Sequence, residues 1–193
     1  HTETMYYQDP DVHAEALYYL ARLWTTVNKS DRALQATNAL KQRYLFTALF
    51  STGVMMPMGY EFGFQRPLHV VKTRPEDWEP PAVDLTAFIT AVNRIKADYP
   101  VFREDGLIQR LESFNPAVLL LWQASTQGHG QALLVLNKDP WNRQHFHCDD
   151  LYRLVQAPPP LLDVSPEWAM DFLPTPFDFE LDPGMARVFV TRP

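Results

Sequence analysis

The chain contains one cysteine, Cys148, and has no apolar run near the roughly 20 residues of a membrane-spanning helix. A single cysteine cannot form an internal disulfide, so we expect a reducing compartment and a cytoplasmic location. The opening residues lack the basic start and apolar segment of a secretory signal peptide. They also lack an initiator methionine, so we expect a fragment or a processed product. No membrane partner is expected.

Basic residues are also scarce, because the net charge of the 193-residue chain is -6 and no basic stripe offsets it. This excludes a typical nucleic-acid-binding surface. The hydrophobic fraction of 46% instead indicates a globular protein with a sizeable core. Glycine is rare and proline abundant, with seven against seventeen residues, and the prolines gather at about 57–81 and 158–183. These two stretches are expected to be long irregular connections.

Helical spacing of apolar residues recurs in the first half of the chain. Residues 10–24 follow a helix-start signal, residues 38–50 have one apolar face, and residues 85–99 follow the capping residue Asp84. Between the first two helices, Trp24–Val27 is typical of a short strand, and Asn28–Arg32 is typical of a polar loop.

The segment Ser51–Phe64 is an apolar run with glycines near both ends, which predicts a strand buried on both faces, although a buried helix fits the same pattern. Its end carries Tyr60 and Glu61, the kind of residues found at the ligand-facing end of a barrel strand. There they would bind sugar hydroxyls. Alternatively, Glu61 pairs with Arg66 or Arg74, and Tyr60 packs under the following loop.

Residues 65–83 contain four prolines and have no regular period. A connection of this length is more often functional than idle. Lys72, Arg74 and Trp78 would suit a sugar phosphate, with the cations on the phosphate and the indole on a ring. The alternative is a solvated loop stiffened by its prolines.

The second half of the chain has the composition of short strands separated by turns. They are predicted at residues 107–112, 117–123, 131–137, 144–147 and 186–191, with a glycine-bearing hairpin loop at 125–130. This pattern favours a small antiparallel β-sandwich. We place the domain boundary near residue 104, which gives domains 1–104 and 105–193.

A histidine-rich stretch in this half raises the question of a metal site. His145 and His147 would lie on one face of a strand, followed by Cys148, Asp149 and Asp150. A structural zinc site needs a second pair of ligands at matching spacing, and none is present. An edge strand running into a loop is therefore predicted, with no metal and no cofactor. Further on, residues 177–182 alternate apolar and acidic, which predicts a half-buried extended segment.

Four segments resemble family-13 glycoside hydrolases, the α-amylase superfamily. They are Arg43–Phe46, Phe50–Phe64, Asp84–Ile89 and Leu181–Phe189. The first three are similar to the eighth strand and eighth helix of that family, closest to the maltosyltransferases that extend α-1,4-glucans from maltose 1-phosphate. The fourth is similar to the last strand of the family's β-sandwich domain. The resemblance is good over residues 40–100, extends to the C-terminus, and is poor before residue 25.

The resemblance implies a fold of the α/β plus all-β class: the C-terminal end of a (β/α)8 barrel followed by a small antiparallel β-sandwich. It implies retaining chemistry with two carboxylates about 5 Å apart in the parent enzyme. Both follow earlier barrel strands and would precede His1. Asn28 and Asp31 match the Asn-x-x-Asp pattern of the maltosyltransferase branch, with Asp31 as the transition-state stabiliser. On its residue type alone, Asp31 is instead an N-cap or loop aspartate.

The expected function is therefore a C-terminal segment of an α-glucan-active, maltosyltransferase-like enzyme, inactive alone. Its expected partners are an α-glucan or maltooligosaccharide, bound by the parent enzyme, and the remainder of the barrel or a second copy, which would cover exposed strand edges. The alternative is a non-catalytic carbohydrate-binding or interaction module whose first 100 residues form a self-contained helical unit.

Overall fold

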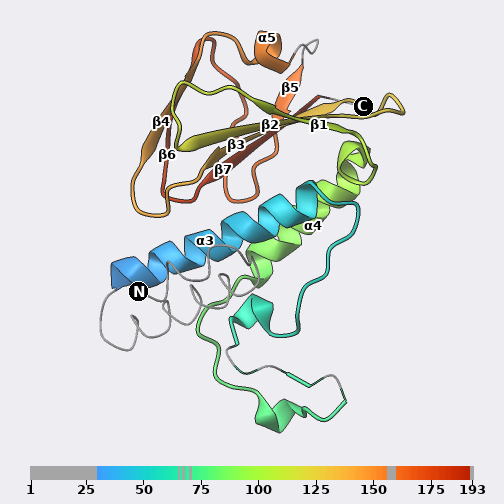
Figure 1. The fold of residues 1–193 in the computed structure, drawn as a ribbon, viewed down its shortest axis with the longest axis vertical. Coiled ribbons are helices and arrows are strands. Elements are labelled where there is room, and N and C mark those ends of the chain that lie inside the picture. The colour runs from blue at the N-terminus through green and yellow to red at the C-terminus, as the bar shows by residue number, and fades with distance from the viewer. Residues whose placement is uncertain (1–29, 65, 67, 70, 156–159, 192–193) are drawn as a thin grey trace.

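A computed structural model describes residues 30–64, 66, 68–69, 71–155 and 160–191 (Figure 1). The helices in this part are α3 (Ser30–Leu49), α4 (Thr86–Asp98), α5 (Leu151–Val155) and the short 3-10 helices η1 (Tyr60–Phe62), η2 (Pro75–Asp77) and η3 (Pro100–Phe102). The strands are β1 (Leu107–Leu111), β2 (Val118–Ala124), β3 (Gln131–Asn137), β4 (Gln144–Cys148), β5 (Leu161–Asp163), β6 (Phe177–Leu181) and β7 (Ala186–Thr191).

The strands form two antiparallel sheets. The larger sheet has the order β1-β2-β3-β7-β5, and the smaller one pairs β4 with β6. In the hairpin of β2 and β3, the register runs from Val118 opposite Asn137 to Ala124 opposite Gln131. The predicted sandwich strands are confirmed, as is the extended segment that became β6. The sequence did not predict β5 and α5, because segments of three and five residues carry too short a pattern.

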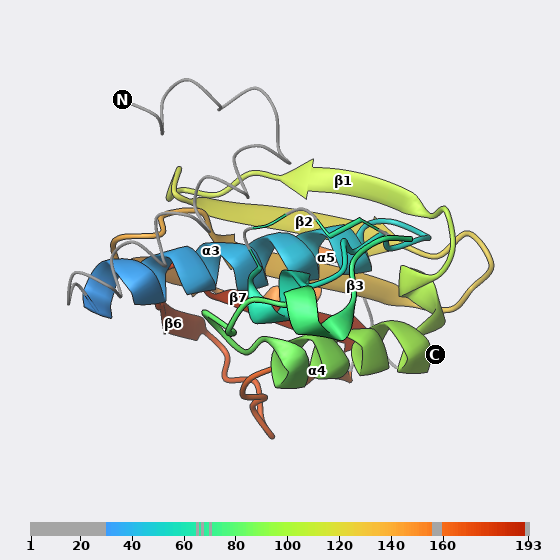
Figure 2. The same ribbon diagram turned by 90° about the horizontal axis from the view of Figure 1, so that it is seen from below.

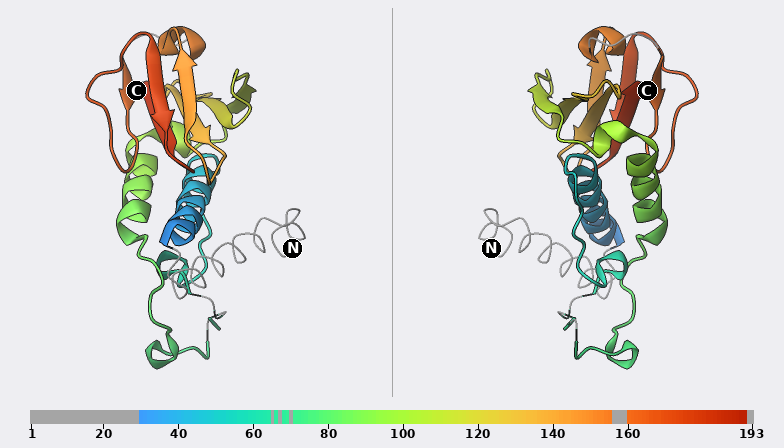
Figure 3. Two further views of the ribbon diagram at one scale, coloured as in Figure 1. Left: turned by 90° about the vertical axis from the view of Figure 1, so that its left-hand side faces the viewer. Right: turned by 90° about the vertical axis from the view of Figure 1, so that its right-hand side faces the viewer.

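The strand β3 lies at the centre of three layers. Leu134 and Leu136 face a core shared with α3 and α4, whereas Leu133 and Val135 face a second core shared with the β4–β6 sheet and α5. Figures 2 and 3 show the two long helices lying across one side of the larger sheet. The first core thus draws residues from both sides of residue 104. The domain boundary at that residue stays a prediction.

Two polar contacts hold the helix pair together. The hydroxyl of Tyr44 on α3 donates to Oδ1 of Asn93 on α4 at 2.8 Å. The ammonium of Lys96, also on α4, donates to the carbonyl of Ala48 at 2.6 Å and to that of Ser51. Lys96 therefore satisfies the Ala48 carbonyl in the last turn of α3, where intrahelical donors run out, and the Ser51 carbonyl just beyond the helix.

The prediction of a buried strand over Ser51–Phe64 is wrong. The segment forms bends, turns and η1, and it pairs with no strand in the described part of the chain. Gly59 and Gly63 adopt left-handed conformations with φ of 86° and 64°, which interrupt an extended run. The side chain of Met55 is 94% exposed rather than buried. No barrel strand is therefore seen in the described residues.

The start of α3 also differs from the prediction. The polar stretch Asn28–Arg32 was expected to be a loop, but α3 begins at Ser30, eight residues before the predicted helix. Serine and aspartate favour helix starts, and the alanine and leucine that follow are strong helix formers. The predicted helix over 10–24, the strand Trp24–Val27 and residue Asn28 lie outside the described residues. Within the described part, no helix has the length and apolar character needed to cross a membrane.

Candidate functional site

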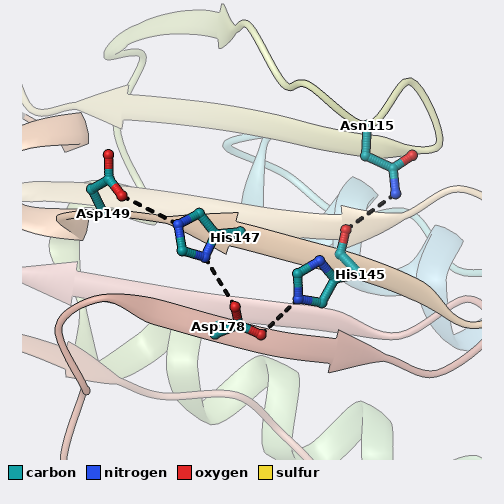
Figure 4. A network of polar contacts seen from close by, with 5 residues as sticks. All are labelled: Asn115, His145, His147, Asp149 and Asp178. Atoms are coloured by element: carbon teal, nitrogen blue, oxygen red, sulfur yellow. Dashed lines mark hydrogen bonds and ion pairs between the residues drawn. The ribbon is translucent and has the colours of Figure 1, made fainter.

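The most polar cluster of the sandwich lies on the β4–β6 sheet. His145 and His147 alternate along β4 and therefore point to the same face, and Asp178 lies opposite His147 on β6. The carboxylate of Asp178 contacts both imidazoles, at 2.6 Å from Nε2 of His145 and 3.0 Å from Nδ1 of His147 (Figure 4). Nε2 of His147 also lies 3.2 Å from Oδ1 of Asp149. One carboxylate thus orients two rings.

A pocket of about 810 Å³ lies beside this cluster. Its wall opposite the histidines is the loop between β1 and β2, which carries Phe114 with a fully exposed ring. Asn115 ties this loop to β4, because its Nδ2 donates to Oε1 of Gln144 at 3.0 Å and to the carbonyl of His145 at 3.1 Å. The pocket therefore combines an aromatic ring with imidazole, amide and carboxylate groups.

The charges in this cluster support one another. The hydrogen bond to Asp178, followed by that to Asp149, raises the pKa of His147 above its ordinary value. The same contacts with His145 and His147 lower the pKa of Asp178. Burial raises the pKa of the Cys148 thiol, so the thiol stays protonated at neutral pH. The cluster therefore pairs a carboxylate with imidazoles and offers no thiolate nucleophile.

The polar side chains of this cluster are engaged with one another in hydrogen bonds. Among the described residues, no group of three or more histidine, cysteine, aspartate or glutamate side chains gathers to hold a metal ion. Nε2 of His145 and both ring nitrogens of His147 instead contact Asp178 and Asp149. Such groups suit the hydroxyls of a polar ligand.

Tyr60 lies in the turn that replaces the predicted strand. Its hydroxyl donates to the carbonyl of Leu40 at 2.8 Å, and its ring centroid lies 6.1 Å from that of Tyr44 on α3. Burial raises the pKa of Tyr60 to about 12. The ring and hydroxyl of Tyr60 therefore contact α3, and a role of Tyr60 in sugar binding stays a prediction.

Glu61 pairs with neither of the cations that the sequence offered. Arg66 bonds Oε1 of Glu79 through its backbone nitrogen, and Arg74 lies 3.9 Å from Glu76. Oε2 of Glu61 is buried and has no hydrogen-bond partner among the described residues. Buried carboxylate oxygens without partners are rare, so Glu61 stays a candidate polar group of this turn.

The other predicted residues of the loop lie apart from the sandwich pocket. Lys72 and Arg74 are exposed, whereas the ring of Trp78 meets Phe64 edge-to-face at 5.9 Å. This contact brings Trp78 to the turn that holds Tyr60 and Glu61. The loop extends away from the sandwich, beyond the helix pair (Figure 3).

Asp31 lies in the first turn of α3, and the strand that the resemblance implies before it lies outside the described residues. Its proposed partner Asn28 lies outside the described residues. Sequence reasoning missed Phe114 and Asn115, which line the sandwich pocket. The turn-forming composition of Ser113–Pro116 between two predicted strands was the signal that marks this loop tip.

Comparison with solved structures identifies the fold. The chain superposes on AmyP, crystallised in complex with maltose, with a TM-score of 0.58 at 11% identity, over 82% of this chain and 35% of that chain. The fold is shared with AmyP. An α-amylase from Geobacillus thermoleovorans in complex with acarbose matches at a TM-score of 0.46 and 16% identity, over 84% of this chain and 33% of that chain. The chain therefore spans about a third of the length of either protein.

The part of the fold that this chain contributes to the AmyP match is mostly antiparallel sheet, arranged as a small β-sandwich. No protein-family model matches the chain, and no curated protein does. The TM-score of 0.58 establishes a common fold with AmyP. The sequence identity of 11% leaves the activity and ligand of this chain open.

Proposed function

We propose that the chain is a C-terminal segment of an α-glucan-active enzyme of the α-amylase superfamily, similar to the maltosyltransferases. The observation that carries this proposal is the fold shared with AmyP over 82% of the chain. The residue-level similarity of Asp84–Ile89 to the eighth helix of that superfamily supports it, because α4 begins within this segment. The maltose in the AmyP structure points to an α-linked glucan as the ligand class.

In this proposal, the chain contributes binding groups to an active site whose principal carboxylates belong to another part of the enzyme. In this arrangement, the turn that holds Tyr60 and Glu61 would border that site. Trp78 packs beside this turn through Phe64, so an α-glucan bound there would meet an indole and a carboxylate. Lys72 and Arg74 extend the same loop and would bind the phosphate of a sugar phosphate.

In the parent enzyme, Asn28 would bind the substrate and Asp31 would stabilise the oxocarbenium-like transition state, as the resemblance implies. This role requires Asp31 to face the substrate from a loop. Its position in the first turn of α3 makes Asp31 the least supported member of the set. The variant Asp31→Asn in the parent enzyme distinguishes a transition-state stabiliser from a helix-start residue. If Asp31 stabilises the transition state, the substitution lowers kcat strongly. If Asp31 only starts the helix, the substitution lowers stability alone.

The chain alone is expected to be inactive, because retaining chemistry needs a nucleophile and an acid/base on opposite sides of the scissile bond. The test incubates the purified chain with maltoheptaose, and separately with maltose 1-phosphate and an α-glucan acceptor. Chromatography should detect no new sugar. Transfer or hydrolysis by the purified chain would contradict this part of the proposal.

The coding sequence upstream of His1 tests the enzyme assignment itself. We expect it to encode an aspartate and a glutamate at the ends of predicted barrel strands. An upstream sequence without such strands would remove the enzyme proposal, whatever the chain binds.

A non-catalytic α-glucan-binding module is the second candidate, favoured by the exposed Phe114 beside the polar groups of the sandwich pocket. Calorimetric titration of the chain with maltooligosaccharides distinguishes the two. Binding without turnover, together with an upstream sequence that has no barrel, would favour the module.

A further inference from the structure

A second groove, of about 700 Å³, runs between α3 and the edge of the sandwich. Asn38 and Lys41 of α3 form one wall, and the segment Ser165–Trp168 forms the facing wall. Trp141 lies at one end of the groove, near the turn between β6 and β7. The volume lies within the range of sites that enclose small ligands. The active-site proposal uses none of these residues.

The indole of Trp168 is held as a fixed platform at this groove. The guanidinium of Arg187 lies 4.8 Å from the centroid of the Trp168 ring and 4.9 Å from that of Phe179. Nη1 of Arg187 also donates to the carbonyl of Trp168 at 2.7 Å. Trp168 is nevertheless 57% exposed as a whole residue. Arg187 and Phe179 therefore fix the ring while much of its surface stays open to solvent.

The support beneath this platform is itself rigid. Arg187 is fully buried and forms an ion pair with Asp163, which is likewise buried. Asp163 also accepts from the backbone nitrogens of Ser165 at 2.9 Å and Met170 at 3.1 Å. The loop that carries Trp168 is thus bound to one carboxylate both before and after Trp168 in the sequence. A platform ordered in advance loses little conformational entropy when it binds a ligand.

The exposed charges around the groove neutralise one another. Nζ of Lys41 lies 2.5 Å from Oε1 of Glu167, and Nε of Arg143 lies 2.6 Å from Oδ1 of Asp182. Among the described residues that line the groove, these pairs leave no unbalanced exposed charge for an ionic ligand. Their oxygen and nitrogen atoms can still form hydrogen bonds with hydroxyl groups. A neutral ligand that is rich in hydroxyls and has an apolar face fits this chemistry.

We infer that the groove is a carbohydrate-binding subsite, separate from the proposed active site, in which a pyranose of an α-glucan stacks on Trp168. The C–H face of a pyranose suits an indole, and its hydroxyls suit the paired charges at the rim. Trp141 offers a second aromatic surface for the same glucan chain. The choice of an α-glucan, rather than another neutral sugar, rests on the proposed function.

The test follows the five tryptophan indole N–H signals by NMR during titration with maltoheptaose, with cellohexaose as the comparison sugar. Tryptophan-to-phenylalanine variants assign the signals. We expect maltoheptaose to shift the signals of Trp168 and Trp141 and cellohexaose to leave them in place. In calorimetry, Trp168→Ala should weaken maltoheptaose binding about tenfold or more, because a central aromatic contact carries a large share of affinity.

A matched control distinguishes the groove from exposed aromatics in general. Phe172 is strongly exposed, lies four residues from Trp168 and lines neither pocket, so Phe172→Ala should leave the affinity unchanged. Trp168→Phe retains a ring and should lose less affinity than Trp168→Ala. Circular dichroism and thermal melting check that each variant is folded.

Four results would overturn the inference: absence of maltoheptaose binding, binding unaffected by Trp168→Ala, equal shifts with cellohexaose, or shifts confined to Trp78. The last result would still favour the proposed active-site loop. Conversely, an upstream sequence without catalytic carboxylates would remove the enzyme proposal while binding at Trp168 stood. The two proposals therefore fail separately.

Discussion

At the residue scale, the ion pair of Arg187 and Asp163 and that of Arg143 and Asp182 differ chiefly in burial. The first pair has no exposed side-chain surface, whereas both partners of the second are more than half exposed. Removing one partner of a buried pair leaves the other charge in the core, whereas exposed pairs contribute little.

We therefore expect Arg187→Met to lower the free energy of unfolding by about 3–5 kcal/mol. The matched variant Arg143→Met should lower it by less than about 1 kcal/mol. Urea denaturation followed by circular dichroism measures both values. Equal losses in the two variants would show that Asp163 is not left as an isolated buried charge.

The contacts of Asp178 make the histidine cluster sensitive to pH. The raised pKa of His147 contributes stability that is present below its ordinary value of 6.5 and is lost as pH rises through the folded-state pKa. The lowered pKa of Asp178 contributes stability that is present above 3.8 and is lost as pH falls through its folded-state pKa. The cluster is therefore strongest between these two ordinary values.

Asp178→Asn should lower the pKa of His147 toward its ordinary value, because the bond to Asp178 is the largest cause of the shift. Asp149→Asn should lower it less, because that carboxylate is the second cause. An NMR titration of the His147 ring measures both variants, with His145, Cys148 and Glu180 as the other titratable groups nearby on the two strands. If the pKa of His147 were unchanged in Asp178→Asn, the hydrogen bond between His147 and Asp178 would be refuted.

At the scale of elements, the sequence pattern predicted the strands and helices that bury one face against a core. The alternation of residues 177–182 and the helical spacing of 85–99 were readable because each has one buried face. The prediction of a buried strand over Ser51–Phe64 was wrong because hydrophobicity alone does not specify burial. The conformation there is set by Gly59, Gly63 and contacts with Phe64, which sequence periodicity does not encode.

Gly59 provides a direct test of the turn. A Cβ atom at this position would lie 2.4 Å from the ring of Phe64, and φ is 86°. Gly59→Ala should therefore lower the free energy of unfolding by about 1–3 kcal/mol. Gly53→Ala is the control, because a Cβ atom there has no neighbour within 4 Å, and its effect should stay within about 0.5 kcal/mol. A stabilising Gly59→Ala would instead favour the extended strand that the sequence pattern predicted.

At the scale of the whole molecule, the candidate sites were predictable only in part. The sequence marked His145 and His147 as two rings on one face, and the structure adds Asp178 from a distant strand. The Trp168 platform depends on Arg187, nineteen residues away along the chain and adjacent only in the fold. Contacts between distant segments follow from tertiary packing, so local patterns cannot reveal them.

The shared core beneath the larger sheet predicts that helices and sheets unfold together. Leu45 of α3 is 1% exposed and belongs to the same cluster as Leu134 and Val188 of the sheet. Leu45→Ala should lower the free energy of unfolding by about 2–5 kcal/mol, because it opens a cavity in that cluster. Helix circular dichroism and the fluorescence of Trp122, in a variant that retains this tryptophan alone, should report the same shifted midpoint.

Leu34→Ala, on an exposed part of α3, should change both signals little. Separate transitions, with the fluorescence of Trp122 unaffected by Leu45→Ala, would instead show that residues 1–104 and 105–193 fold as independent domains, as a boundary near residue 104 allows.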